Sequence, residues 1–214
     1  MKKLIDSIKS VATSFALVLL VATVTWGAVY LASKPIESPT VEKVQIQYYA
    51  RIAAIYEGNV DWRFYITTKM LEKMAPQFIG KPMLLGHDWR NPNVCVGRVV
   101  DAAVKEDVFG HYVEVVVLIN SDEAADMIAR DAYHSVSIGW ETLKAICMID
   151  NLDPEICGHE PGHRYKIGTH VLNSRHIIQE ATMHEVSFVN VPASPNARVL
   201  ELAAHRLSCS DKSK

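Results

Sequence analysis

The feature that most constrains this chain is an uncharged apolar run near its start. Residues 11–32 read VATSFALVLLVATVTWGAVYLA, and lysines stand just outside the run at positions 9 and 34. A helix of that length would measure about 33 Å, which matches the hydrocarbon core of a bilayer. We therefore predict that residues 1–32 form an N-terminal hydrophobic helix that anchors the chain in a membrane through residues 11–32.

The charges around this run predict its orientation. Three lysines precede it against one aspartate, and the positive-inside rule then keeps the N-terminus in the cytoplasm. Trp26 and Tyr30 stand near the far end, where aromatic side chains favour the interface between lipid and water. Residues 36–214 would then lie outside the cytoplasm. The alternatives are an inverted orientation, or a helix that is buried against a hydrophobic partner.

After this run the pattern changes. Residues 33–43 carry two prolines among polar residues and predict a linker, and residues 208–214 form a polar tail. Between them, residues 44–207 mix β-rich apolar runs with short helical patterns. Strands are predicted at residues 44–56, 94–105, 111–119, 135–143 and 183–191, and helices at about 68–75, 122–132 and 195–205. We expect a strand-dominated α+β fold and not a doubly wound sheet.

The helix boundaries follow from capping residues. Thr67 or Thr68 is the predicted N-cap of the first helix, and Pro76 is predicted to stop it. Ser121 is the predicted N-cap of the second helix, whose first turn carries two acidic side chains beside the positive end of the helix dipole.

The composition narrows the classes of function. The formal net charge is -2 and no block of like charge stands out, so we expect no nucleic-acid partner, because such proteins are normally basic. The four cysteines are scattered through a chain too long to need disulfide staples. We expect most of them to be reduced thiols.

Three short stretches hold residue types that can do chemistry: LLGHDW at 84–89, SVSIGW at 135–140 and HEVSF at 184–188. Taken singly, each has an ordinary explanation as a loop histidine, a hydrogen-bonded strand serine and a solvated glutamate. A triad of serine, histidine and acid is defined by its geometry in space. Spacing alone therefore leaves the triad as one possibility among several.

Three longer blocks carry a family resemblance. They read IGKPMLLGHDWRNPNVCVGRVVDAAV, YHSVSIGWE and MHEVSFVNVPASPNARV, in that order. From about residue 45 to residue 200, the chain resembles the prohead (capsid maturation) serine proteases of tailed phages. The resemblance implies a barrel-like domain edged by helices, similar to the herpesvirus assemblin proteases. It also implies Ser137 as nucleophile, His87 as base and Glu185 as the acid that orients the histidine.

The residue types suit these roles. A serine hydroxyl is a weak nucleophile until an imidazole accepts its proton, and a carboxylate on the other ring nitrogen fixes the tautomer. Strand alternation puts Ser137 and Gly139 on one face, where Gly139 is expected to let the substrate backbone approach closely. Glu141 or His184 remains an alternative to Glu185. Arg98 is an alternative supporting residue, or simply a solvated arginine.

A second cluster of reactive side chains lies between the second and third blocks. This segment is rich in glycine and proline and contains Cys147, Cys157, His159 and His163. Closely spaced cysteine and histidine side chains are able to bind zinc tetrahedrally. The spacing fits no standard zinc finger. A structural zinc site, a Cys147–Cys157 disulfide and an inert loop all remain open, and the predicted peptidase chemistry needs no cofactor.

The resemblance predicts the setting of the activity. The expected substrates are capsid and scaffold proteins, and the chain itself, during head maturation in a prohead inside the host cell, where the protease is expected to self-associate. Two alternatives stand beside this prediction. One is a non-catalytic, membrane-tethered structural relative of the protease fold. The other is a membrane-anchored serine protease with a substrate outside the capsid.

Overall fold

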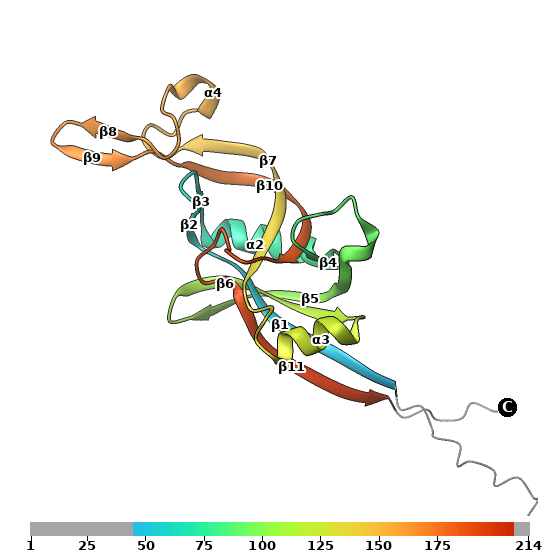
Figure 1. Ribbon diagram of the computed structural model, residues 1–214. Helices are drawn as coiled ribbons and strands as arrows, with labels where there is room; N and C mark the ends of the chain where they lie inside the picture. Colours follow the sequence, from blue (N-terminus) through green and yellow to red (C-terminus); the bar gives the residue numbers. More distant parts are fainter. Residues whose placement is uncertain (1–44, 208–214) are drawn as a thin grey trace, which may run out of the picture. The chain divides into compact units, whose positions relative to one another are not determined.

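Segments rich in valine, isoleucine and tyrosine form the long strands of a curled sheet in this computed structural model, which describes residues 45–207 (Figure 1). The strand order is β11-β1-β6-β5-β4-β10-β3-β2, and β7 pairs with β10 outside this path. The strands are β1 Gln45–Tyr56, β2 Gly58–Val60, β3 Phe64–Ile66, β4 Pro82–Leu85, β5 Cys95–Asp107, β6 Gly110–Ile119, β7 Val136–Cys147, β8 Arg164–Ile167, β9 His170–Asn173, β10 His176–Phe188 and β11 Arg198–Leu207. The helices are α2 Thr68–Phe78, α3 Asp122–Ala129 and α4 Pro154–Cys157, with a 3₁₀ turn η1 at Pro92–Val94. The predicted strand-dominated α+β fold is confirmed.

The sheet curls until its far strands meet. An isolated bridge joins Ser135, just before β7, to Arg198 at the start of β11. The backbone N–H of Val136 donates to the carbonyl of Ala197 at 3.2 Å, and that of Val199 donates to the carbonyl of His134 at 2.8 Å. The curl encloses one apolar core, since strand residues that alternate inward pack there with the apolar face of α2.

Helix α2 runs further than predicted. Its N-cap is Thr67, which was one of the two predicted caps. The side chain of Thr67 accepts a hydrogen bond from the backbone N–H of Met70. The helix continues through Pro76 to Phe78, so the predicted stop at Pro76 is wrong. The side-chain amide of Gln77 donates to the carbonyl of Lys73 at 3.1 Å and to that of Ala181 on β10 at 3.2 Å. These bonds join the last turn of the helix, beyond Pro76, to the preceding turn and to β10.

The predicted helix at 195–205 is also wrong, because Arg198–Leu207 is strand β11. This alanine-containing segment pairs antiparallel with β1 from Ala53↔Arg198 to Gln45↔Leu207. A sheet edge offers unpaired backbone groups over the same length, and that tertiary pairing outweighs a weak helix propensity. The predicted strands at 44–56, 94–105 and 111–119 are confirmed, and so is Ser121 as N-cap of α3.

The predicted hydrophobic helix at 1–32 and the linker at 33–43 lie outside the described residues. Within residues 45–207, no helix is both long and apolar enough to cross a membrane.

Glu57 ties three elements together where β1 ends. Its carboxylate accepts from the hydroxyl of Thr68, at the start of α2, and from both the backbone N–H and the ring Nδ1 of His111, on β6, at 3.0 Å and 2.9 Å. Hydrogen bonding to Thr68, and then to His111, lowers the pKa of Glu57 to about 2. The same carboxylate raises the pKa of His111 above its ordinary value of 6.5.

The variant Glu57→Gln should therefore lower the free energy of unfolding by about 1–2 kcal/mol, because charge-assisted hydrogen bonds are lost. The difference from wild type should be largest between about pH 4.5 and 6.5. Below that window Glu57 becomes protonated in the folded state as the pH falls toward 2, and above it His111 loses its proton. Urea unfolding from pH 2 to 9 measures this, with the exposed Glu180→Gln as control; a pH-independent difference contradicts the account.

Candidate active site

His87 lies in a tight turn directly after β4. Gly86 and His87 both have positive φ angles, +69° and +52°, and such a conformation is rare for a residue with a side chain. Two bonds to β10 hold the turn. The N–H of Gly86 donates to the carbonyl of Phe188 at 3.0 Å, and the N–H of His87 donates to Oγ of Ser187 at 3.1 Å. Because β4 runs parallel to the end of β10, the turn places the imidazole beside that strand.

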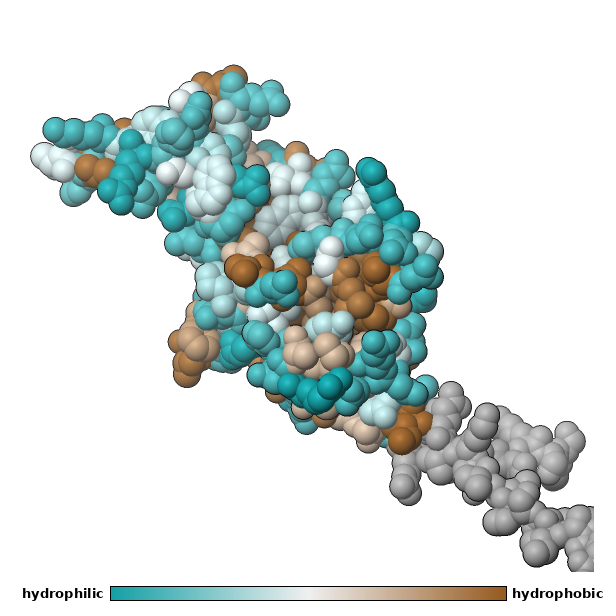
Figure 2. Space-filling model, viewed as in Figure 1, coloured by the Kyte–Doolittle hydropathy of each residue, from teal (hydrophilic) through white to brown (hydrophobic). Residues whose placement is uncertain are grey.

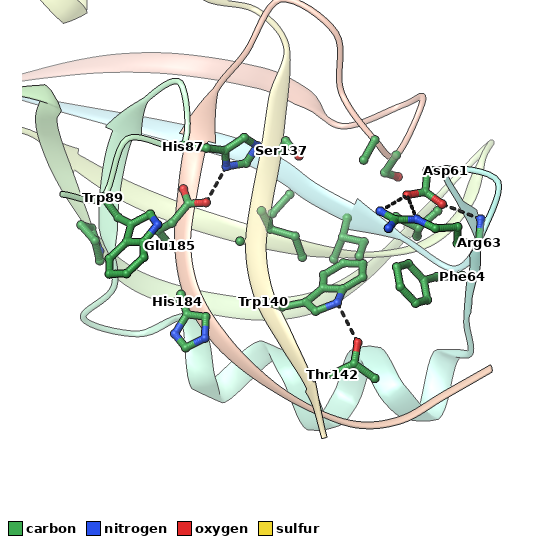
Figure 3. A pocket seen from close by; sticks show the side chains of 18 residues that line it. Asp61, Arg63, Phe64, His87, Trp89, Ser137, Trp140, Thr142, His184 and Glu185 are labelled. Atoms are coloured by element: carbon green, nitrogen blue, oxygen red, sulfur yellow. Dashed lines mark hydrogen bonds and ion pairs between the residues drawn. The ribbon is translucent and has the colours of Figure 1, made fainter. Parts of the chain in front are cut away.

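Glu185 of β10 is the acidic partner of this histidine. Its Oε1 lies 2.6 Å from Nδ1 of His87 (Figure 3). Its Oε2 accepts a hydrogen bond from the hydroxyl of Ser187. Only 2% of Glu185 is exposed to solvent. A buried carboxylate needs such partners, since burial without them costs several kcal/mol. The structure thus joins two of the three predicted site residues.

An irregularity in β10 aims Glu185 into the site. Met183 pairs with Trp140 and Glu185 pairs with Gly139, so β10 has one more residue than β7 at this point, and His184 is the extra residue. In a regular strand Met183 and Glu185 would face the same side. Because of this bulge, Met183 packs in the apolar core while Glu185 lines a pocket.

Ser137 lies on β7, opposite Ser187 of β10. Residues opposite each other in an antiparallel pair have Cβ atoms roughly 5 Å apart on the same face. Ser187 in turn binds both the backbone of His87 and the carboxylate of Glu185. Ser137 and His87 line the same pocket, but no hydrogen bond joins them in this structure, and Ser137 is only 7% exposed.

Gly139 lies directly against the carboxylate of Glu185. A Cβ atom built on this residue would overlap Oε1 of Glu185 and lie 3.1 Å from its Cδ and Cγ atoms. The missing side chain therefore makes room for the buried carboxylate. Gly139 also lines the pocket, and the expectation that it lets substrate backbone approach closely stays a prediction.

The pocket has a volume of about 880 Å³. Aromatic rings of Phe64, Trp89 and Trp140 line it together with the polar group around His87. In Figure 3 the ion pair of Asp61 and Arg63, with 3.0 Å between Oδ2 and Nη2, appears on the other side of the pocket from His87. A pocket of this size, part apolar and part charged, suits a side chain or a short stretch of peptide.

Of the alternative site residues, His184 lines the pocket and Glu141 does not. His184 and Glu141 face each other across β10 and β7, with 3.9 Å between Nε2 and Oε2. Arg98 is exposed on β5 and does not line the pocket. Ser187 went unnoticed in the sequence, although its position two residues after Glu185 in a strand places it on the same face.

The electrostatics of His87 follow from this pairing. The hydrogen bond that Nδ1 of His87 donates to Glu185 raises the pKa of His87 above 6.5, while partial burial of the ring acts against the rise. Nδ1 is engaged by the carboxylate, so in the neutral imidazole it carries the proton and Nε2 is left as the basic nitrogen. Such a ring can accept a proton from a hydroxyl group brought to its Nε2.

The predicted cluster of cysteine and histidine side chains is brought together only in part. Cys147, Cys157 and His159 lie close together, but His163 is exposed and faces Glu160 at 3.4 Å. Asp150, which the sequence analysis missed, takes the fourth position. The thiols of Cys147 and Cys157 are free, so the disulfide alternative is not formed here.

Comparison of the chain with protein-family models, with curated proteins and with solved structures gave no match.

The variant Gly139→Ala tests the packing of the carboxylate. The added methyl group should displace Glu185 from His87, lower the pKa of His87 toward 6.5, and lower the free energy of unfolding by about 1–3 kcal/mol. Histidine titration followed by NMR, together with urea unfolding, measures both effects. Ser135→Ala, just before the same strand, is the control. An unchanged His87 pKa in a folded Gly139→Ala variant would show that the carboxylate does not depend on this space.

Proposed function

We propose that this chain is a serine endopeptidase of the prohead protease type, which cleaves capsid and scaffold proteins, and the chain itself, during phage head maturation. One observation carries the proposal: the ion pair of His87 and Glu185 borders a pocket that Ser137 enters from the neighbouring strand. A histidine oriented by a buried acid beside a serine is the arrangement that acyl transfer requires. The substrate and setting come from the sequence resemblance, as does a fold of the assemblin type, with which the curled sheet agrees.

The proposed reaction has two halves. Ser137 Oγ attacks the peptide carbonyl while Nε2 of His87 takes its proton, and the imidazolium then protonates the leaving amine. Water next attacks the acyl-enzyme, with His87 again as base, and releases Ser137. Glu185 stabilises the imidazolium in both halves. Because Ser137 and His87 are not hydrogen-bonded here, the proposal includes a small approach of the two side chains when substrate binds.

The edge of β7 supports an extended substrate. Within residues 45–207, β7 pairs along its length only with β10, and the bridge at Ser135 occupies just the start of its other edge. A peptide that added to this free edge would run past Ser137 with its backbone groups paired. The aromatic side chains of the pocket would then contact the peptide side chains.

A second candidate is a non-catalytic relative of this fold, tethered to a membrane through residues 11–32. The burial of Ser137 and the absence of a bond to His87 favour it. The third reading, a membrane-anchored protease with another substrate, differs only in location and substrate.

Labelling with a fluorophosphonate probe tests the nucleophile. Wild-type chain should be labelled and Ser137→Ala should not, with a loss of peptide cleavage of roughly 10⁴-fold or more. The matched control is Ser135→Ala, a buried serine just before the same strand, which should keep its labelling. Labelling of Ser137→Ala would overturn the assignment, and a folded wild-type chain without labelling would favour the non-catalytic relative.

The pH profile of kcat/KM tests the acid. Cleavage should fall at low pH as His87 becomes protonated, with a midpoint above 6.5, because Glu185 raises the pKa of the ring. In Glu185→Gln the midpoint should move down toward 6.5 and the plateau should drop by about a thousandfold or more. Glu141→Gln, which changes the acid facing His184, should leave both unchanged. Equal effects of the two variants contradict the role of Glu185.

A further inference from the structure

A long excursion leaves the sheet between β7 and β10. It carries α4 and the hairpin of β8 and β9, which forms a separate two-stranded sheet (Figure 1). None of residues 151–173 is buried, and apolar side chains such as Ile156 and Val171 are 73% and 63% exposed. Figure 2 shows brown, apolar patches on the surface of this excursion. A lone hairpin without an apolar core is marginally stable in water. Some other interaction must hold this excursion in place.

Four potential metal ligands meet at the base of the excursion. Ligand atoms of Cys147, Asp150, Cys157 and His159 all lie within 4.8 Å of one another. The distance from Cys147 Sγ to His159 Nδ1 is 3.6 Å, and that from His159 Nδ1 to Asp150 Oδ2 is 3.1 Å. Around a tetrahedral zinc ion, with bonds of about 2.0–2.3 Å, neighbouring ligand atoms lie roughly 3.3–3.8 Å apart. The four side chains are thus almost at the spacing that zinc requires.

The local backbone holds the ligands in this arrangement. The N–H of Asn151 donates to the carbonyl of Cys147 at 2.9 Å and closes the turn that brings Asp150 back toward Cys147. Gly158 has a φ of +69° and turns the chain between Cys157 and His159. The N–H of His159 donates to Cys157 Sγ at 3.3 Å. Backbone donors of this kind orient and stabilise metal-bound thiolates.

We propose that Cys147, Asp150, Cys157 and His159 bind one Zn²⁺ ion, through two thiolates, a carboxylate oxygen and Nδ1 of the imidazole. Four protein ligands leave no open position, so the site is structural. Cys147 is the last residue of β7 and pairs with His176 at the start of β10, so the ion ties the excursion to the sheet where it departs. The proposal does not depend on the peptidase activity.

The ion also supports one wall of the pocket. A Cβ atom on Gly162, in the loop just after the ligands, would overlap the ring of Trp62. Trp62 stands between Asp61 and Arg63, which line the pocket. Loss of the ion would free the loop at Gly162 and loosen this wall.

Zinc analysis of the purified full-length chain tests the proposal. Elemental analysis under reducing conditions should find about one zinc per chain, and Co²⁺ reconstitution should give the thiolate charge-transfer and intense visible bands of a tetrahedral site. Cys157→Ser and His159→Ala should lose the zinc, while His163→Ala, which changes the exposed histidine nearby, should keep it. Hydrogen exchange at β8 and β9 should speed up in the zinc-free variants.

Asp150→Asn removes the charged ligand but keeps the shape of the side chain. It therefore tests zinc binding even if the cysteine and histidine variants fail to fold. It should weaken zinc affinity by about tenfold or more while the rest of the chain keeps its hydrogen-exchange protection. A full-length chain that binds no zinc with both thiols free, a Cys147–Cys157 disulfide found by mass spectrometry, or loss of zinc from His163→Ala would each overturn the proposal. If the chain binds zinc but is not labelled by a fluorophosphonate probe, the zinc proposal stands and the peptidase proposal fails.

Discussion

Strand β10 is the element on which the rest of this structure depends. Along one edge it pairs with β7, and along the other it pairs in parallel with β3 near its start and with β4 near its end. Strand β10 carries Glu185, β7 carries Ser137, and β4 directly precedes His87. The backbone hydrogen bonds of β10 with β7 and β4 therefore position all three candidate site residues. A register slip of one residue would turn every side chain to the opposite face, so the site and the core are specified together.

The buried carboxylate of Glu185 on β10 needs several neighbouring groups that offset the free-energy cost of removing its charge from water. Glu185 receives a hydrogen bond from Ser187 and faces Nδ1 of His87, and Gly139 leaves the space that its oxygen occupies. Removing one partner of a buried ion pair usually costs more than the pair contributes, because the remaining charge stays unpaired. Burying Glu185 is therefore costly for the stability of the fold. Such a cost suits a carboxylate that orients the imidazole of His87 and favours its charged form.

How much the sequence could predict differed between elements. Strands β1, β5 and β6 have strong β-rich patterns, and they were predicted nearly to their ends. The helix expected at 195–205 was wrong because backbone pairing with the edge of β1 outweighs the helix propensity of its alanines. The association of Glu185 with His87 was predicted only through the family resemblance. The bulge at His184 and the contribution of Asp150 depend on contacts between distant or irregular segments, for which no sequence period exists.

The two clusters of reactive side chains lie at opposite ends of the same strand pair. Ser137 and Ser187 face each other near one end of β7 and β10, and Cys147 and His176 face each other at the other end. Between them β10 contains several register shifts, and each shift locally disrupts the hydrogen-bond ladder and increases the twist of the strands. The hydrogen bonds that join β4 and its turn to β10 fix one end. The excursion has no apolar core that could fix the other end. A metal ion at the base of the excursion would fix that end, and this is the physical reason that it would affect the candidate site at the far end of the same strands.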